Sequence, residues 1–292
     1  MTKRLVLVGV LAACGGGSGG GADAQIDASA TFQALITSPW SLQPGSEVYQ
    51  CATLTIPRDM YISELRPIAP LGTHHTVVNV ITNPTASDNP GYVCSMPFEL
   101  PGTMIYGSGV GSVPFVYPDG IALHLRAGSQ IHINLHLFNT GDSVLTGTSG
   151  VEVKETSVAS VMHEARFVIS GQATLSIPPG TSTQTGTCTL PSDVAIISYQ
   201  PHMHQLGTHQ TYTVTPASGA PFVLFDSDYT FDGQRHVMMD PIVTLHAGDQ
   251  VKIDCTYNNT TTSTVTFGES TTDEMCFAGM SIYPYNASYC GT

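Results

Sequence analysis

The segment PHMHQLG contains two histidines, His202 and His204, spaced two residues apart. On a β-strand, residues i and i+2 point to the same face, so both imidazoles could converge on one metal ion. Imidazole suits zinc, copper, iron and nickel ions. The pattern therefore indicates a transition-metal site, although taken alone it is about equally typical of an ordinary surface strand.

Three further histidines lie in the N-terminal half of the chain. His74 and His75 are adjacent, so on a regular strand they would face opposite ways, and they can share one metal only at a bend or a strand end. His136 lies on the polar face of a strand whose Ile131 and Ile133 point the other way. No cluster contains a carboxylate, which disfavours a magnesium or calcium site and the iron site of two histidines and one carboxylate.

The remaining histidines stand alone rather than in HH or HxH motifs. Such a residue is more often a surface or hydrogen-bonded side chain than a metal ligand, and we apply this interpretation even to His132, which shares the face of His136. We expect no metal at His124, His132, His163, His209, His236 or His246.

The composition limits both fold and partners. The 292 residues are 41% hydrophobic and 11% charged, and 9 Lys+Arg oppose 22 Asp+Glu, which gives a net charge of −13. This balance excludes nucleic-acid binding through phosphate contacts and disfavours a basic patch that docks on anionic lipid. The 29 glycines and 19 prolines favour short strands and turns over long helices, so we expect an all-β fold.

Two stretches of the chain resemble each other, LRAGSQIHINLHLFNT from Leu125 and LHAGDQVKIDCTYNNT from Leu245. Each predicts a turn at Ala-Gly followed by an alternating strand, and each half has a histidine cluster upstream. These features indicate a duplicated unit. We therefore predict two tandem antiparallel β-sandwich (jelly-roll-like) domains, at residues 39–157 and 158–292, with the junction near Glu155–Ser160.

The N-terminus predicts export. Lys3 and Arg4 precede the apolar run LVLVGVLAA, which is too short to span a bilayer. The sequence LAAC that ends at Cys14 resembles a bacterial lipobox, and GGGSGGGAD follows it as a flexible tether. We predict a signal peptide with a lipidated Cys14 over residues 1–14, a tether over residues 15–38, and a bacterial envelope protein anchored by lipid alone. The alternative is an ordinary secretory signal.

Six cysteines follow Cys14. An even number in an exported chain predicts disulfides, although spacing alone leaves the pairing open. The chain has no CxxC motif, which disfavours a zinc knuckle or a thioredoxin-like site.

Taken in order, these motifs resemble the copper type II, ascorbate-dependent monooxygenases, the family of peptidylglycine α-hydroxylating monooxygenase and dopamine β-monooxygenase. The similarity extends over nearly the whole chain after residue 40. It rests on YQC from Tyr49, IPRDMY, the pair His74-His75, HLFNTGD around His136, IPPG from Ile177, HMHQLG from His202, TTDEMC from Thr271, and Cys290.

The resemblance implies two copper ions in each chain, in a cleft between the domains. It implies that His74, His75 and His136 bind the first and that the catalytic His202, His204 and Met275 bind the second. It also implies the disulfides Cys51–Cys94, Cys188–Cys290 and Cys255–Cys276, and a position for Tyr49 near the first copper. A thioether ligand favours Cu(I) over zinc.

The activity implied by the resemblance is hydroxylation of a C–H bond of a small organic substrate. Dioxygen binds at the second copper, and ascorbate or another one-electron reductant reduces both. The amidating branch of the family reads a substrate carboxylate with an Arg two residues before HxH and with an Asn and a Tyr after the Met-Cys pair. This chain has Gln200, Phe277 and Gly279 there, so we do not expect a peptidylglycine substrate. We expect a monomer.

Two other functions fit the same composition. A copper-binding envelope lipoprotein that stores or delivers metal could use the same ligands, and ascorbate-dependent oxygen consumption would separate it from an enzyme. An all-β surface protein with incidental histidines would not bind copper tightly and stoichiometrically.

Overall fold

The computed structural model describes residues 31–94, 101–268 and 270–290. Over these residues the chain is nearly all β, with the short 3₁₀ turns η2 (Val158–Ser160) and η3 (Phe231–Gly233) between strands. The predicted all-β class is confirmed. Cys14, the signal peptide and most of the tether lie outside the described residues. None of the helices in the described ranges has the length and apolarity of a membrane span.

One sheet of the N-terminal half is built around a central strand, β9, with which β2 and β4 both pair in antiparallel register. Its strands, in spatial order, are β5 (Asn89–Val93), β2 (Glu47–Thr55), β9 (Gln130–Phe138), β4 (Thr73–Ile81) and β6 (Thr103–Ser108). Ile131 and Ile133 face the N-terminal core, as their alternation predicted. His132 and His136 occupy the opposite face and are buried too.

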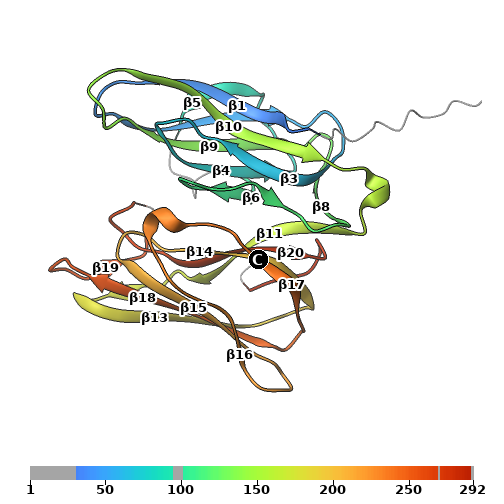
Figure 1. Cartoon of the computed structure of the whole chain (residues 1–292), viewed down its shortest axis with the longest axis vertical. Coiled ribbons are helices and arrows are strands. Elements are labelled where there is room, and N and C mark those ends of the chain that lie inside the picture. Colours follow the sequence, from blue (N-terminus) through green and yellow to red (C-terminus); the bar gives the residue numbers. More distant parts are fainter. Residues whose placement is uncertain (1–30, 95–100, 269, 291–292) are drawn as a thin grey trace, which may run out of the picture.

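A long second sheet runs through both halves of the molecule (Figure 1). Its strands, in spatial order, are β1 (Gln33–Leu42), β10 (Leu145–Glu155), β3 (Met60–Ile68), β8 (Ile121–Leu125), β11 (His163–Gln172), β20 (Cys276–Tyr283), β14 (Val194–His202) and β17 (Val237–Leu245), with β7 (Phe115–Val116) beside β3. The halves join where β8 and β11 pair in parallel. The segment Glu155–Ser160 corresponds to the end of β10 and to η2, directly before β11.

The C-terminal half has its own sheet around a central strand, β18. Its strands are β13 (Gly180–Thr189), β18 (Gln250–Asn259), β15 (Gly207–Thr215) and β16 (Phe222–Asp228), and a short pair is formed by β12 (Ser176–Ile177) and β19 (Val265–Thr266). The apolar core divides into an N-terminal and a C-terminal cluster, so each half packs two layers of sheet on each other.

The duplicated segments fold alike. Gly128 and Gly248 take positive φ angles of 79° and 92° in the turns before β9 and β18, a conformation that favours glycine. Asn139 and Asn259 are buried just after Phe138 and at the end of β18. Each donates a side-chain hydrogen bond to the carbonyl four residues further along, at 2.8 and 2.9 Å. The internal repeat predicted from sequence is therefore visible in the hydrogen bonding of both halves.

The structure contains the disulfides that the resemblance implied. They are Cys51–Cys94, Cys188–Cys290 and Cys255–Cys276. The first joins β2 to the end of the β5 segment, and the other two lie in the C-terminal half. Each bridge thus stays within one half of the chain.

Candidate metal centres

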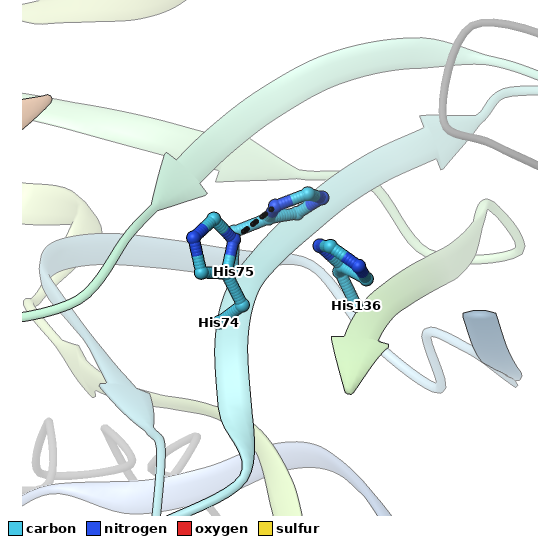
Figure 2. Close-up of side chains that lie close together, drawn as sticks. All are labelled: His74, His75 and His136. Atoms are coloured by element: carbon cyan, nitrogen blue, oxygen red, sulfur yellow. Dashed lines mark hydrogen bonds between the residues drawn. The ribbon is translucent and has the colours of Figure 1, made fainter. Parts of the chain in front are cut away.

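A cluster of imidazoles lies where β4 and β9 run side by side. His74 and His75 are the second and third residues of β4, and His75 stands opposite His136 of β9 in the strand register. One ring nitrogen from each of the three residues lies within 4.8 Å of the others. Figure 2 shows the three rings gathered at one point between the strands. We call these three residues the first cluster.

A β-bulge explains how two adjacent histidines reach the same point. The register of β4 against β9 shifts between Thr73 and His75, so His74 is an extra residue in the ladder. The Nδ1 atoms of His74 and His75 lie 3.3 Å apart as a result. The sequence required a bend or a strand end for two adjacent histidines to share one metal ion, and this bulge provides the bend.

The hydrogen bonds of His136 determine which of its nitrogens is available. Its Nε2 lies 2.5 Å from Oε1 of Glu47, and an ionised carboxylate can only accept, so Nε2 carries the proton. Its Nδ1 is buried and has no hydrogen-bond partner among the described residues. Tyr49 stacks on the ring at 4.6 Å. An unprotonated Nδ1 without a hydrogen-bond partner, beside two other imidazoles, is what a metal-binding nitrogen requires.

Burial favours the neutral forms of His74 and His75. It lowers the pKa of His74, and it lowers the pKa of His75 well below the ordinary value, with a further contribution from the neighbouring His136. Imidazole must be neutral to bind a metal ion, so these surroundings favour coordination.

A second cluster forms where β14 ends and β20 begins. His202 is the last residue of β14, His204 lies in the connection to β15, and Met275 directly precedes β20. Nε2 of His202 lies 3.3 Å from Sδ of Met275, and the rings of His202 and His204 are 5.4 Å apart. We call these three residues the second cluster.

One expectation about this cluster needs correction. The strand predicted through the HxH motif ends at His202, so strand alternation does not place His204. The two clusters also do not occupy equivalent positions of the repeat. The partner of His136 across the strands is His75, whereas the equivalent Thr256 of β18 faces His209 of β15. His209 pairs with Asp226 and Asp228 instead.

Hydrogen bonds fix the orientation of both imidazoles in the second cluster. Nδ1 of His202 lies 2.6 Å from Oε1 of Gln234, and the amide of Gln234 is itself oriented by its Nε2, which donates to the carbonyl of Phe231. Nδ1 of His204 donates to the carbonyl of Asp273 at 3.0 Å. Both imidazoles therefore leave Nε2 unprotonated. Burial lowers the pKa of His202 to about 4 and also lowers the pKa of His204.

A buried carboxylate holds the second cluster together. Glu274 is fully buried and accepts backbone N–H bonds from His204 at 2.8 Å, Leu206 at 2.7 Å and Met275 at 3.3 Å. Burial raises its pKa to about 7, against the opposing effect of these donors. The segment that carries His204 is thus tied to the segment that carries Met275. Sequence reasoning gave Glu274 no role, although it belongs to the motif DEMC, and it also missed Gln234 and Glu47.

The donor atoms of the two clusters differ in softness. The first offers imidazole nitrogens alone, and the second offers imidazoles with a thioether, a soft ligand that favours Cu(I). Neither cluster contains a carboxylate, which would suit magnesium or calcium. Both donor sets fit copper.

A cavity of about 240 Å³ is lined by residues of both clusters. Phe231, from η3, lies between them, with its ring 5.6 Å from that of His74 and 6.1 Å from that of His204. The same segment supplies Gln234 to His202 and His236 to the N-terminal half, where its Nε2 donates to the carbonyl of Gly107. The chain from 231 to 236 therefore bridges the halves beside the cavity.

The other histidines have contacts outside the clusters. His132 bonds Tyr92, His124 bonds Glu164, His163 stacks on Tyr283, and His246 lies 3.6 Å from Asp193. None of them joins a group of metal-binding side chains within the described ranges.

Comparisons with known proteins agree with the chemistry of the clusters. Residues 159–292 match the family model of the copper type II ascorbate-dependent monooxygenase, C-terminal domain. Human DBH-like monooxygenase protein 2 is 26% identical over 240 residues, which cover 73% of this chain and 47% of that protein. Mouse DBH-like monooxygenase protein 1 is 24% identical over 281 residues, which cover 84% of this chain and 46% of that protein. The chain thus spans about half the length of these curated relatives.

Among solved structures, the major capsid protein P2 of bacteriophage PM2 shares 9% identity with this chain at a TM-score of 0.40. The match covers 87% of this chain and 100% of the capsid protein. A likeness this weak carries no argument about function.

Proposed function

We propose that this protein, whose residues 159–292 belong to the copper type II, ascorbate-dependent monooxygenase family, is a two-copper monooxygenase. It hydroxylates a C–H bond of a small organic substrate with dioxygen and an ascorbate-type one-electron reductant. The first cluster holds one copper ion and the second cluster holds the other.

The contact between His202 and Met275 carries this proposal. A buried methionine usually packs among apolar side chains, whereas the sulfur of Met275 lies 3.3 Å from an imidazole nitrogen. The other nitrogen of that ring already bonds Gln234, so Nε2 is left as a ligand atom. Two imidazoles and a thioether form a donor set that favours Cu(I) over zinc.

Copper bound at the clusters supplies one-electron redox chemistry with dioxygen. The chain's own residues bind and orient. Glu47 and Gln234 hold ring protons on the nitrogens that face away from the metal, and Glu274 ties His204 to Met275. The ring of Phe231 fills space between the clusters and helps to exclude water.

We assign the first copper to a domain over residues 39–157 and the second to a domain over residues 158–292, in a chain that acts as a monomer. The separate apolar clusters support this division, as do the disulfides, each of which stays within one half. The long sheet that crosses from β8 to β11 joins the two halves that carry the copper sites.

Oxygen uptake tests the activity. Copper-loaded protein should consume dioxygen with ascorbate only when a suitable organic substrate is present, and product should form in proportion. Met275→Ile should abolish this uptake. Met280→Ile, a matched change of a buried core methionine in β20, should keep it. Copper binding without coupled turnover on a broad substrate panel would instead favour a storage or delivery protein.

The disulfides indicate an exported protein. We propose further that a lipid on Cys14 anchors it to a bacterial envelope, which rests on the sequence LAAC and the Gly-rich segment after it. Fatty-acid labelling of expressed protein should mark the wild type and leave Cys14→Ser unlabelled. A labelled Cys14→Ser variant, or an unlabelled wild type, would contradict the anchor.

A further inference from the structure

The wall of the cavity beside the second cluster is formed by three neighbouring strands. Met275, just before β20, and Phe277 and Gly279 within it lie at alternate positions and so share one face. Gly279 is flanked by Ile169 of β11 and Gln200 of β14 in the strand register. A ligand that reaches Met275 therefore lies against Phe277 and Gly279.

The ring of Phe167 occupies the space that a side chain at position 279 would fill. A Cβ built there would lie 2.4 Å from Cζ of Phe167 and 3.3 Å from Oε1 of Gln200. The ring of Phe167 thus covers this part of the wall, and position 279 offers no hydrogen-bond donor to a ligand. Across the cavity, Val77 and Met104 add further apolar surface.

The cavity offers little to a charged ligand. None of the described residues that line it is a lysine or an arginine, and the acidic one, Asp232, is exposed. In the metal-free protein, burying a carboxylate or an ammonium here would remove its hydration without an ion pair in return. The nearly buried amide of Gln200 offers polar contact close to the second cluster, because its Nε2 makes only a long bond of 3.5 Å to the carbonyl of Gln234.

We infer that this cavity takes an uncharged substrate with an apolar or aromatic body, whose single neutral polar group meets the amide of Gln200. That this ligand is a substrate rests on the proposed function. The inference adds that, in the metal-free protein, both the carboxylate and the ammonium analogues of a good ligand bind poorly.

A matched set of probes tests the inference. We would measure calorimetric dissociation constants of 3-phenylpropanamide, 3-phenylpropanoate and 3-phenylpropylammonium with the copper-loaded full chain, and again without added metal. In the metal-free form the amide should bind at least about tenfold more tightly than either ion. A gain in propanoate affinity confined to the copper-loaded form reports its coordination to copper. Equal or tighter binding of an ion to the metal-free wild type, or no binding of the amide, would overturn the inference.

Variants locate the effect in the wall. Gln200→Arg should reverse the preference in favour of the propanoate, because a guanidinium pairs with a carboxylate. Gln250→Arg, which adds the same charge at an exposed site outside the cavity lining, should leave the wild-type order unchanged. An unchanged preference in a folded Gln200→Arg protein would contradict this placement.

The binding experiment can fail or succeed independently of the proposed monooxygenase activity. Amide-selective binding without any oxygen uptake would remove the monooxygenase and keep the ligand class. Ascorbate-dependent turnover of carboxylate substrates would keep the monooxygenase and remove the ligand class.

Discussion

The two clusters reach similar groups of donor atoms by different structural means. The first lies on paired strands, where one bulge at His74 brings adjacent histidines to a third on the neighbouring strand. The second lies on a strand end and its following connection, with Met275 next to the start of β20. Strand pairing with a single bulge places the first cluster, whereas the buried carboxylate of Glu274 places much of the second.

The clusters also present opposite ring nitrogens. In the first, Glu47 holds the proton of His136 on Nε2, so Nδ1 faces the site. In the second, Gln234 and the carbonyl of Asp273 hold the protons of His202 and His204 on Nδ1, so Nε2 faces the site. The partner of each imidazole therefore determines which atom can bind metal, and exchange of partners should affect one cluster at a time.

The largest expected effect is the loss of one copper from either cluster alone. Met275→Ile should reduce the copper count from two to one, because no donor atom remains at that position. His136→Ala should also leave one copper, at the second cluster. Metal analysis after full loading measures both. If either variant lost both ions, the clusters would not be independent.

Met280→Ile is the matched control for the methionine change. Met280 is fully buried in the C-terminal core. Its replacement by a residue of similar volume should cost less than ~1.5 kcal/mol and keep both copper ions.

Glu274→Gln should weaken copper binding at the second cluster by about 10–100-fold and leave the first unchanged. A glutamine amide has one accepting oxygen, and its NH₂ group would face backbone N–H donors that the carboxylate now satisfies. Competition with a Cu(I) chelator, carried out on the copper-loaded wild type and on copper-loaded Glu274→Gln, gives the copper affinities of the two clusters. An equal loss at both clusters would mean that Glu274 stabilises the fold as a whole.

The repeated asparagines should behave alike although the clusters do not. Asn139→Ala and Asn259→Ala each remove two side-chain hydrogen bonds to backbone carbonyls. Each should lower the free energy of unfolding by about 1–3 kcal/mol without changing the copper count. Denaturant titration checks this. A large effect at only one asparagine would show that the two turns are not equivalent.

Glu47→Gln should have the smallest effect. The side chain of Glu47 is largely exposed, and a glutamine oxygen can still accept from Nε2 of His136. We expect first-cluster affinity to fall by about tenfold or less, through weaker polarisation of the ring. The same chelator competition measures it, and an effect equal to that of Glu274→Gln would contradict the contrast between exposed and buried partners.

The sequence predicted the fold well where its signals were local. The alternation from Ile131 to His136 and the turn at Gly128 predicted β9, and the copy from Leu245 predicted β18. The long shared sheet was not predicted, because the parallel pairing of β8 with β11, which covers three residue pairs, has no signature in the sequence of either strand.

The sequence also named the residues that gather in the clusters, because HH, HxH and Met-Cys are recognisable motifs. It missed the residues that orient them. Gln234 lies 32 residues from His202 and Glu47 lies 89 residues from His136, and both are common residue types in ordinary surroundings. Only the folded chain brings these partners together.

X-ray absorption of the fully loaded, reduced protein, combined with a copper count, tests the central claim most directly. We expect two copper ions per chain and a sulfur scatterer at copper, which disappears in Met275→Ile and persists in Met280→Ile. One copper or fewer in the wild type, preferential zinc occupancy, or no copper–sulfur signal would contradict it.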